Sequence, residues 1–118
     1  MLKKIFPFAL LTLVVACDSP VGKVGADGYR FGKPSFERSQ IDMRVVTYKT
    51  RREFMIAAKK HGVKSDTVVA FSELKPPEFN VCIVHIMDPR VDYQPEFMGH
   101  ELAHCLYGQW HTNNDSRE

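Results

Sequence analysis

The stretch that organises this chain reads His100-Glu101-Leu102-Ala103-His104-Cys105-Leu106-Tyr107-Gly108-Gln109-Trp110-His111. His100 and His104 are four residues apart, so on a helix both rings lie on one face, one turn apart. This spacing lets a ring nitrogen of each histidine bind the same metal ion. Three of the chain's five histidines fall within these twelve residues. The stretch therefore predicts a metal site carried by a helix.

The helix is expected to run from Pro95 to about Tyr107. Proline is favoured in the first turn of a helix, and Glu96 is well placed against the positive end of the helix dipole. Gly108 can take the left-handed conformation that ends a helix. On the face opposite the ligands, four residues follow the i, i+4, i+7, i+8 spacing of a core stripe, which predicts that they are buried: Met98, Leu102, Cys105 and Leu106.

Glu101 lies beside the first ligand on the same edge of the helix. From there it cannot easily bind the same ion, but it can reach a water that the ion binds. Zinc lowers the pKa of such a water toward about 7, and a nearby carboxylate can take its proton as the water attacks a carbonyl. We therefore expect Glu101 to be the general base that activates a zinc-bound water.

The rest of the folded part alternates between strands and helices. In chain order we expect a strand over 43–48, a helix over 51–61 between Thr50 and Gly62, a strand over 67–71 that 72–74 could extend, and a strand over 80–87. Adding the helix over 95–107 gives the order β-α-β-β-α. This order predicts a small α+β domain, with the site helix packed on a small mixed or antiparallel sheet.

The N-terminal residues are typical of a targeting segment. Lys3 and Lys4 precede an apolar run over 5–16, which is shorter than the roughly 20 residues that cross a bilayer. The run ends in Val14-Val15-Ala16-Cys17. This ending resembles the lipobox of bacterial lipoproteins, which implies cleavage before Cys17 and a diacylglycerol on its thiol. An ordinary secretory signal peptide is the alternative.

These features predict three parts: a signal peptide over 1–16, a lipid-anchored tether over 17–40 and a folded domain over 41–118. The tether is predicted because the residues before about position 40 are rich in Gly, Pro and Ser and lack apolar periodicity. The resemblance implies an anchored protein in the bacterial cell envelope that faces the periplasm or the exterior.

Charge argues against binding to nucleic acid. The chain has 16 basic and 14 acidic residues, and two of the basic ones are Lys3 and Lys4. Removal of the signal peptide would leave fourteen of each, so no basic excess remains to displace counterions from phosphates.

The number of cysteines is consistent with an exported protein. If Cys17 is lipidated, Cys82 and Cys105 remain as a pair, and in an oxidising compartment such a pair predicts a disulfide. The alternative is two buried free thiols.

The site stretch resembles the zincin metallopeptidases, and in particular the metzincin branch with its HExxHxxGxxH pattern. The resemblance implies a zincin-like domain, a Zn²⁺ ion held by His100, His104 and His111, and Glu101 as general base. The chain departs from the pattern because three residues, and not two, separate His104 from Gly108. One extra residue rotates the helix exit by about 100°, so Asp115 and the more distant His85 are competing third ligands.

A second departure from the pattern and further expectations concern the surroundings of the site. Metzincins continue into a subdomain with a Met-containing turn, whereas only seven residues follow His111 and none is Met. The strand over 80–87 is expected near the site, where an exposed edge could pair with an extended peptide, although its apolar residues on both faces favour a covered strand. Trp110 is expected to pack over the site. Tyr107, Tyr93 and His85 are candidate donors to an oxyanion.

The expected function is hydrolysis of a peptide or protein in the cell envelope by a zinc metallopeptidase. The first alternative is a non-catalytic zinc-binding envelope lipoprotein, which the short chain favours and Glu101 disfavours. The second is a structural envelope lipoprotein in which the motif is accidental.

Overall fold

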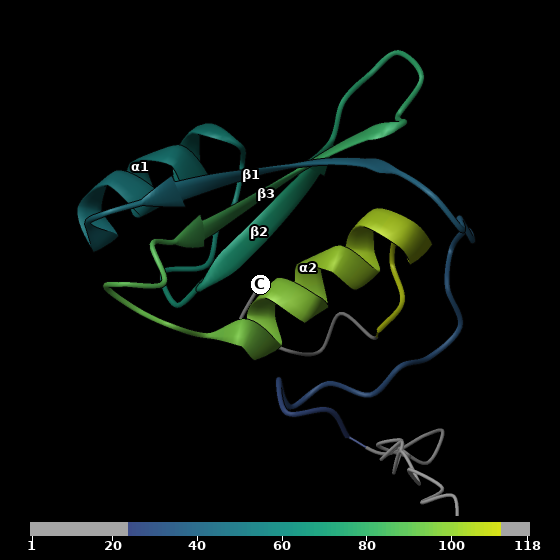
Figure 1. Cartoon of the computed structure of the whole chain (residues 1–118), viewed down its shortest axis with the longest axis horizontal. Helices are drawn as coiled ribbons and strands as arrows, with labels where there is room; N and C mark the ends of the chain where they lie inside the picture. Colours follow the sequence, from purple (N-terminus) through teal and green to yellow (C-terminus); the bar gives the residue numbers. More distant parts are fainter. Residues whose placement is uncertain (1–23, 112–118) are drawn as a thin grey trace, which may run out of the picture.

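The structure is a computed structural model, and it describes residues 24–111. Within this range the elements are β1 (Asp42–Tyr48), α1 (Arg51–Lys60), β2 (Ala70–Leu74), β3 (Val81–Met87) and α2 (Pro95–Tyr107), as Figure 1 shows. The predicted α+β class and its β-α-β-β-α order are confirmed. β2 begins three residues later than predicted, because Ser65 Oγ accepts a hydrogen bond from the Thr67 amide and holds a local turn there.

The described strands form one mixed sheet in the order β1-β3-β2. β1 pairs in parallel with β3, from Asp42 opposite Val81 to Tyr48 opposite Met87. β2 pairs antiparallel with β3, from Ala70 opposite Ile86 to Leu74 opposite Cys82. β3 is therefore central and has no free edge for a peptide, which explains its apolar residues on both faces. β2 is an edge strand instead.

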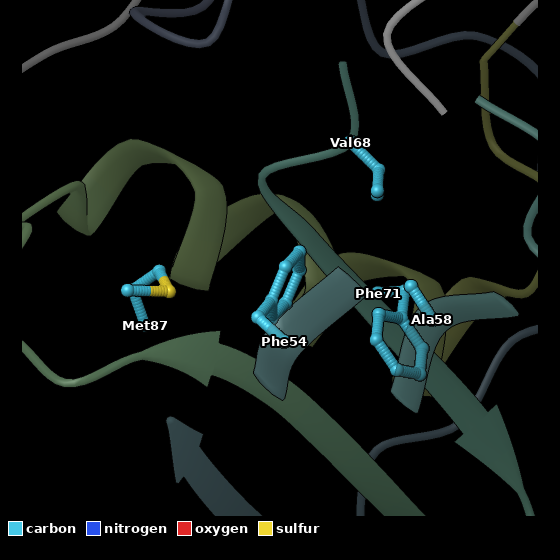
Figure 2. Packing of buried hydrophobic residues seen from close by; sticks show 5 residues of the cluster. All are labelled: Phe54, Ala58, Val68, Phe71 and Met87. Carbon is cyan, nitrogen blue, oxygen red and sulfur yellow. The ribbon is translucent and has the colours of Figure 1, made fainter. Parts of the chain in front are cut away.

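One face of the sheet packs against α1. Thr50 caps this helix by accepting a hydrogen bond from the Glu53 amide at 3.2 Å. Figure 2 shows the core on this face, in which the helix, the sheet and the loop before β2 bury apolar side chains together: Phe54, Ala58, Val68, Phe71 and Met87. This core fixes the C-terminal end of α1 over the sheet.

The other face packs against α2, so the sheet lies between the two helices (Figure 1). Cys82 on β3 and Cys105 on α2 form a disulfide within a second buried cluster. Both cysteines are almost fully buried, at 1% and 0% exposure. The disulfide therefore holds the site helix against the central strand.

Of the four members of the apolar stripe predicted for α2, only Cys105 is buried, and Leu106 is half-buried. Met98 and Leu102 are 37% and 39% exposed. The helix is rotated so that Glu101 and Cys105 are buried and Phe97 packs against the sheet cluster. Bonding of Cys105 to the central strand explains this rotation, since it turns the Met98–Leu102 side toward solvent.

The segment before β1 is part of the folded domain from residue 24 onward. Backbone hydrogen bonds run from Gly32 to Trp110 at 2.8 Å, from Ser35 to Gln109 at 3.0 Å and from Arg38 to Leu106 at 2.9 Å. Figure 1 shows this segment running along α2 before it enters β1. The predicted boundary between tether and domain at 40–41 is therefore too late, because these bonds satisfy backbone groups that apolar periodicity does not reveal.

The predicted signal peptide, the acylated Cys17 and the competing ligand Asp115 lie outside the described residues. Among residues 24–111, neither helix has the length and apolar character needed to cross a membrane.

Candidate metal centre

Three histidine side chains converge at the C-terminal end of α2. The Nε2 atom of His104 lies 3.1 Å from that of His100 and 3.1 Å from that of His111. The Nε2 atoms of His100 and His111 are 3.2 Å apart. Three nitrogens around a tetrahedral zinc at 2.0–2.1 Å would be separated by roughly 3.3–3.4 Å, so the triangle is close to the size that one ion requires.

The other ring nitrogens of two of these histidines are held by oxygen atoms. His100 Nδ1 lies 2.8 Å from Asp27 Oδ2, and His104 Nδ1 lies 2.7 Å from the Gly108 carbonyl oxygen. A carbonyl oxygen and an ionised carboxylate can both only accept hydrogen bonds. The proton of each ring is therefore placed on Nδ1, which leaves Nε2 with its lone pair.

This arrangement fits a bound cation. Lone pairs on neighbouring Nε2 atoms repel one another when they face the same point at 3.1 Å. A metal ion at that point turns the repulsion into coordination. Metal-bound histidines characteristically donate their second N–H to a carboxylate or a backbone carbonyl, and both kinds of partner are present here. These residues can thus hold a metal ion.

Asp27 reaches His100 from a tight turn in the N-terminal segment. The Gly25 amide donates to the Tyr29 carbonyl at 2.7 Å, and the Tyr29 amide donates to Asp27 Oδ1 at 3.0 Å. Gly28 takes a φ of 88°, which lets the chain reverse beside the carboxylate. One oxygen of Asp27 therefore holds the turn, while the other orients the ligand ring.

Gly108 ends α2 in a conformation that only glycine takes readily, with φ 64° and ψ −128°. A Cβ atom here would lie 2.3 Å from Ser35 Oγ and 2.5 Å from Phe36 Cε1. This tight exit returns the chain so that His111 completes the triangle. α2 extends to Tyr107 before it turns, so the three residues between His104 and Gly108 still let His111 reach the other two histidines.

Glu101 is 3% exposed and faces the sheet. Ser72 on β2 donates a hydrogen bond from its hydroxyl to Glu101 Oε2 at 2.6 Å. The short distance is typical of a hydroxyl bound to an ionised carboxylate. Glu101 is therefore held in one orientation beside the histidines by a strand residue.

A cavity of about 300 Å³ opens next to this carboxylate. Its walls come from α2, from the residues directly after it, from β2 and from the loop before β2. The polar side chains on these walls belong to Ser72, Glu101, His104 and Gln109. The base candidate and one ligand candidate therefore share a cavity along the edge strand of the sheet.

Aromatic rings enclose the histidines on the side of the N-terminal segment. The Trp110 ring centroid lies 4.9 Å, 5.6 Å and 4.6 Å from those of His100, His104 and His111. Tyr29 packs at 4.3 Å from His100 and 4.4 Å from His111. The expected packing of Trp110 over the site is confirmed, and the enclosure restricts the rotation of the ligand rings.

The structure brings together His100, Glu101, His104 and His111 but none of the expected oxyanion donors. Tyr93 is 70% exposed, and Tyr107 packs on Phe31. His85 lies on the α1 face of the sheet, so it can be neither a third ligand nor an oxyanion donor at this site.

Protein-family models, curated proteins and solved structures give no match to this chain.

Two residues of the site were not anticipated from the sequence. Asp27 is next to Gly28, which is typical of a turn, but nothing in that pattern indicates a contact with residue 100. Ser72 became a partner of Glu101 only through the register of β2. Both contacts join residues far apart in the chain, whereas the predicted ligands share a short local spacing.

Proposed function

We propose that this protein is a zinc-dependent metallopeptidase of the bacterial cell envelope, with His100, His104 and His111 as zinc ligands and Glu101 as general base. One observation carries the proposal: the histidine triangle adjoins a cavity whose wall holds both Glu101 and His104. A protein that only stores zinc needs the triangle but no carboxylate or cavity beside it.

Zinc is the proposed ion because three neutral imidazoles with room for a further ligand are a typical catalytic zinc set. When bound, zinc would act as a Lewis acid on a carbonyl oxygen and lower the pKa of a bound water toward about 7. Asp27 and the Gly108 carbonyl would hold His100 and His104 in the tautomer that presents Nε2.

Glu101 would move the proton. Its carboxylate would accept a proton from the attacking water and return it to the leaving amine. The hydrogen bond from Ser72 to Oε2 would hold the carboxylate in place during both transfers. Among residues 24–111, the outer edge of β2 pairs with no other strand and lies beside the cavity, so an extended peptide could pair with it. The proposed substrate is thus a peptide or an unfolded protein segment.

The first experiment measures the zinc content of the purified full chain and of a His104→Ala variant. We expect about one zinc at the triangle in the parent and none there in the variant. A correctly folded parent that holds no zinc at this site would overturn the proposal.

The second experiment tests catalysis with Glu101→Gln, assayed on a library of fluorogenic peptides. The variant should keep zinc at the triangle and lose cleavage by a factor of about 10²–10⁴, as expected when a general base is removed. Glu96→Gln, in the first turn of the same helix, is the matched control and should cleave normally. If the zinc-loaded parent cleaves no peptide, or if Glu101→Gln cleaves as fast as the parent, the non-catalytic zinc-binding lipoprotein replaces this proposal.

Attachment to the membrane through Cys17 belongs to the same proposal and has its own test. Cells fed a labelled fatty acid should incorporate the label into the parent protein but not into a Cys17→Ser variant. Equal labelling of both proteins would refute the anchor and leave the zinc site unaffected.

A further inference from the structure

The remaining two histidines of the chain meet on the opposite face of the sheet. His61 caps the C-terminal end of α1, Glu73 lies on β2 and His85 lies on β3. Each offers one ligand atom, and these atoms lie within 4.8 Å of one another. Each of the five histidines of this chain therefore belongs to one of two clusters of three side chains that could hold a metal ion.

His85 is the buried member of this second cluster. Its side chain is 5% exposed, and the Tyr48 hydroxyl lies 2.8 Å from its Nδ1. Its ring stacks on Phe71 at a centroid distance of 4.2 Å with 7° between the planes, so it is not free to turn. Its Nε2 atom is buried and has no hydrogen-bond partner among residues 24–111. Such an atom lacks the partner that nearly all buried polar groups have.

The unpartnered nitrogen points toward the carboxylate of the same cluster. His85 Nε2 lies 3.8 Å from Glu73 Oε1, too far for a hydrogen bond but short enough for two ligands of one ion. Glu73 Oε2 lies 2.6 Å from His61 Nδ1. The side chains of His61 and Glu73 are 31% and 22% exposed, so an ion could enter from solvent.

An ordinary surface ion-pair network explains only part of this geometry. The Lys75 ammonium lies 3.3 Å from Glu73 Oε1 and supplies a positive charge. It can pair with Glu73, and so can His61, but neither gives the buried nitrogen of His85 a partner. A cation held by all three side chains satisfies every group. Lys75 is 51% exposed and can move into solvent when the ion binds.

We propose that His61, Glu73 and His85 form a second metal site that binds a divalent transition-metal ion. The donor set of two imidazoles and one carboxylate suits ions of this class better than Mg²⁺ or Ca²⁺, which prefer oxygen ligands. Tyr48 would orient the His85 ring through Nδ1, as Asp27 orients His100 in the first site. The bound ion would join the end of α1 to β2 and β3.

The site is tested by counting zinc in the purified full chain after equilibration with Zn²⁺ and removal of free ions. We expect about two zinc ions per chain in the parent, about one in Glu73→Gln and about one in His104→Ala. The double variant should bind none. Glu78→Gln, in the connection between β2 and β3, is the matched control and should still bind two zinc ions.

Lys75→Ala keeps the test decisive if removal of a ligand disturbs folding. Loss of the competing ammonium should tighten binding at the second site several-fold in a competition titration with a chromophoric chelator. A folding defect cannot produce tighter binding. A Lys75→Ala variant with unchanged affinity, or a parent whose count is the same in Glu73→Gln, would overturn the second site.

The outcomes separate this proposal from the peptidase. One zinc that disappears in His104→Ala and persists in Glu73→Gln supports the first site and refutes the second. One zinc that persists in His104→Ala and disappears in Glu73→Gln refutes the first site and supports the second.

Discussion

Asp27 is the residue of the N-terminal segment that forms a hydrogen bond with the histidine triangle. Replacement by alanine removes the acceptor for His100 Nδ1, so zinc affinity should fall by about 10–100-fold, the usual effect of losing such a partner. Asp27→Asn should retain more affinity, because its amide oxygen can still accept the hydrogen bond. A competition titration with a chelator measures the zinc affinity of the parent and of each variant. Asp42→Ala, an exposed acid at the start of β1, is the control, and equal affinities in Asp27→Ala and the control would contradict the role.

Gly108 is a second residue on which the site depends. Gly108→Ala combines a strained positive φ with close contacts to Ser35 and Phe36. The backbone strain alone should lower the free energy of unfolding by about 1–3 kcal/mol, as measured by urea titration. Gly99→Ala is the control, since a Cβ there meets no atom within 4 Å. Alanine at that helical position should be neutral or stabilising by up to about 1 kcal/mol. Equal stabilities for the two variants would contradict the structural argument.

At the scale of elements, the disulfide holds α2 against β3. Cys82 and Cys105 are 23 residues apart, and closing a loop of this length stabilises a fold by roughly 3 kcal/mol in the chain-entropy account. A Cys82→Ala, Cys105→Ala double variant should lose about that amount in urea titrations. Reductant should destabilise the parent but not the double variant. A parent that is equally stable with and without reductant would argue against the bond.

The connection from β3 to α2 contains an acid-sensitive pair. Hydrogen bonds from the Arg90 side chain and amide lower the pKa of Asp88 to about 2 from its ordinary value of 3.8. Because the folded state lowers this pKa, the ionised carboxylate stabilises the fold above about pH 4, and this contribution is lost as the pH falls toward 2. The metal-free parent should be more stable than metal-free Asp88→Asn at pH 5, and the difference should shrink toward pH 2. A difference that does not depend on pH would contradict this assignment.

The helices and strands were the part of this fold most readily predicted from the sequence. The capped helices and β-branched strands carry local patterns, and they form close to where those patterns lie. The rotation of α2 was not predicted, because the burial of Glu101 and Phe97 in place of Met98 and Leu102 depends on how the helix packs against the sheet. The spacing of His100 and His104 is local, so it was enough to indicate a metal site. The contact of Ser72 with Glu101 depends on the register of β2, which the sequence does not reveal.

For the whole molecule, the histidine triangle joins the N-terminal segment, α2 and the chain that follows it. A metal ion that binds the folded state and not the unfolded state stabilises the fold by about 2.7 kcal/mol when its concentration is one hundred times its Kd. Removing the metal with a chelator should therefore lower the unfolding temperature. Hydrogen exchange should accelerate most at the amides of Gly32, Ser35 and Arg38, which bond to the segment around the triangle. Equal acceleration throughout β3 would contradict this local coupling.

The cluster of His61, Glu73 and His85 was not predicted from the sequence, because it forms only when the whole molecule is folded. His61 and His85 are 24 positions apart and belong to different elements. Only the packing of α1 on the sheet brings them to Glu73, whereas the HExxH spacing lies within one helix.

Ser72 and Glu73 are neighbours on β2, yet one donates to Glu101 on the α2 face and the other faces His61 on the α1 face. A strand places successive side chains on opposite faces, so a slip of β2 by one position would turn each of them to the other face. A slip that brought Glu73 to the place of Ser72 would set it against the like charge of Glu101, and Leu74 would replace the carboxylate between His61 and His85. An insertion or deletion of one residue that shifted β2 in this way would thus damage both sites at once, although it would leave every histidine of the chain unchanged.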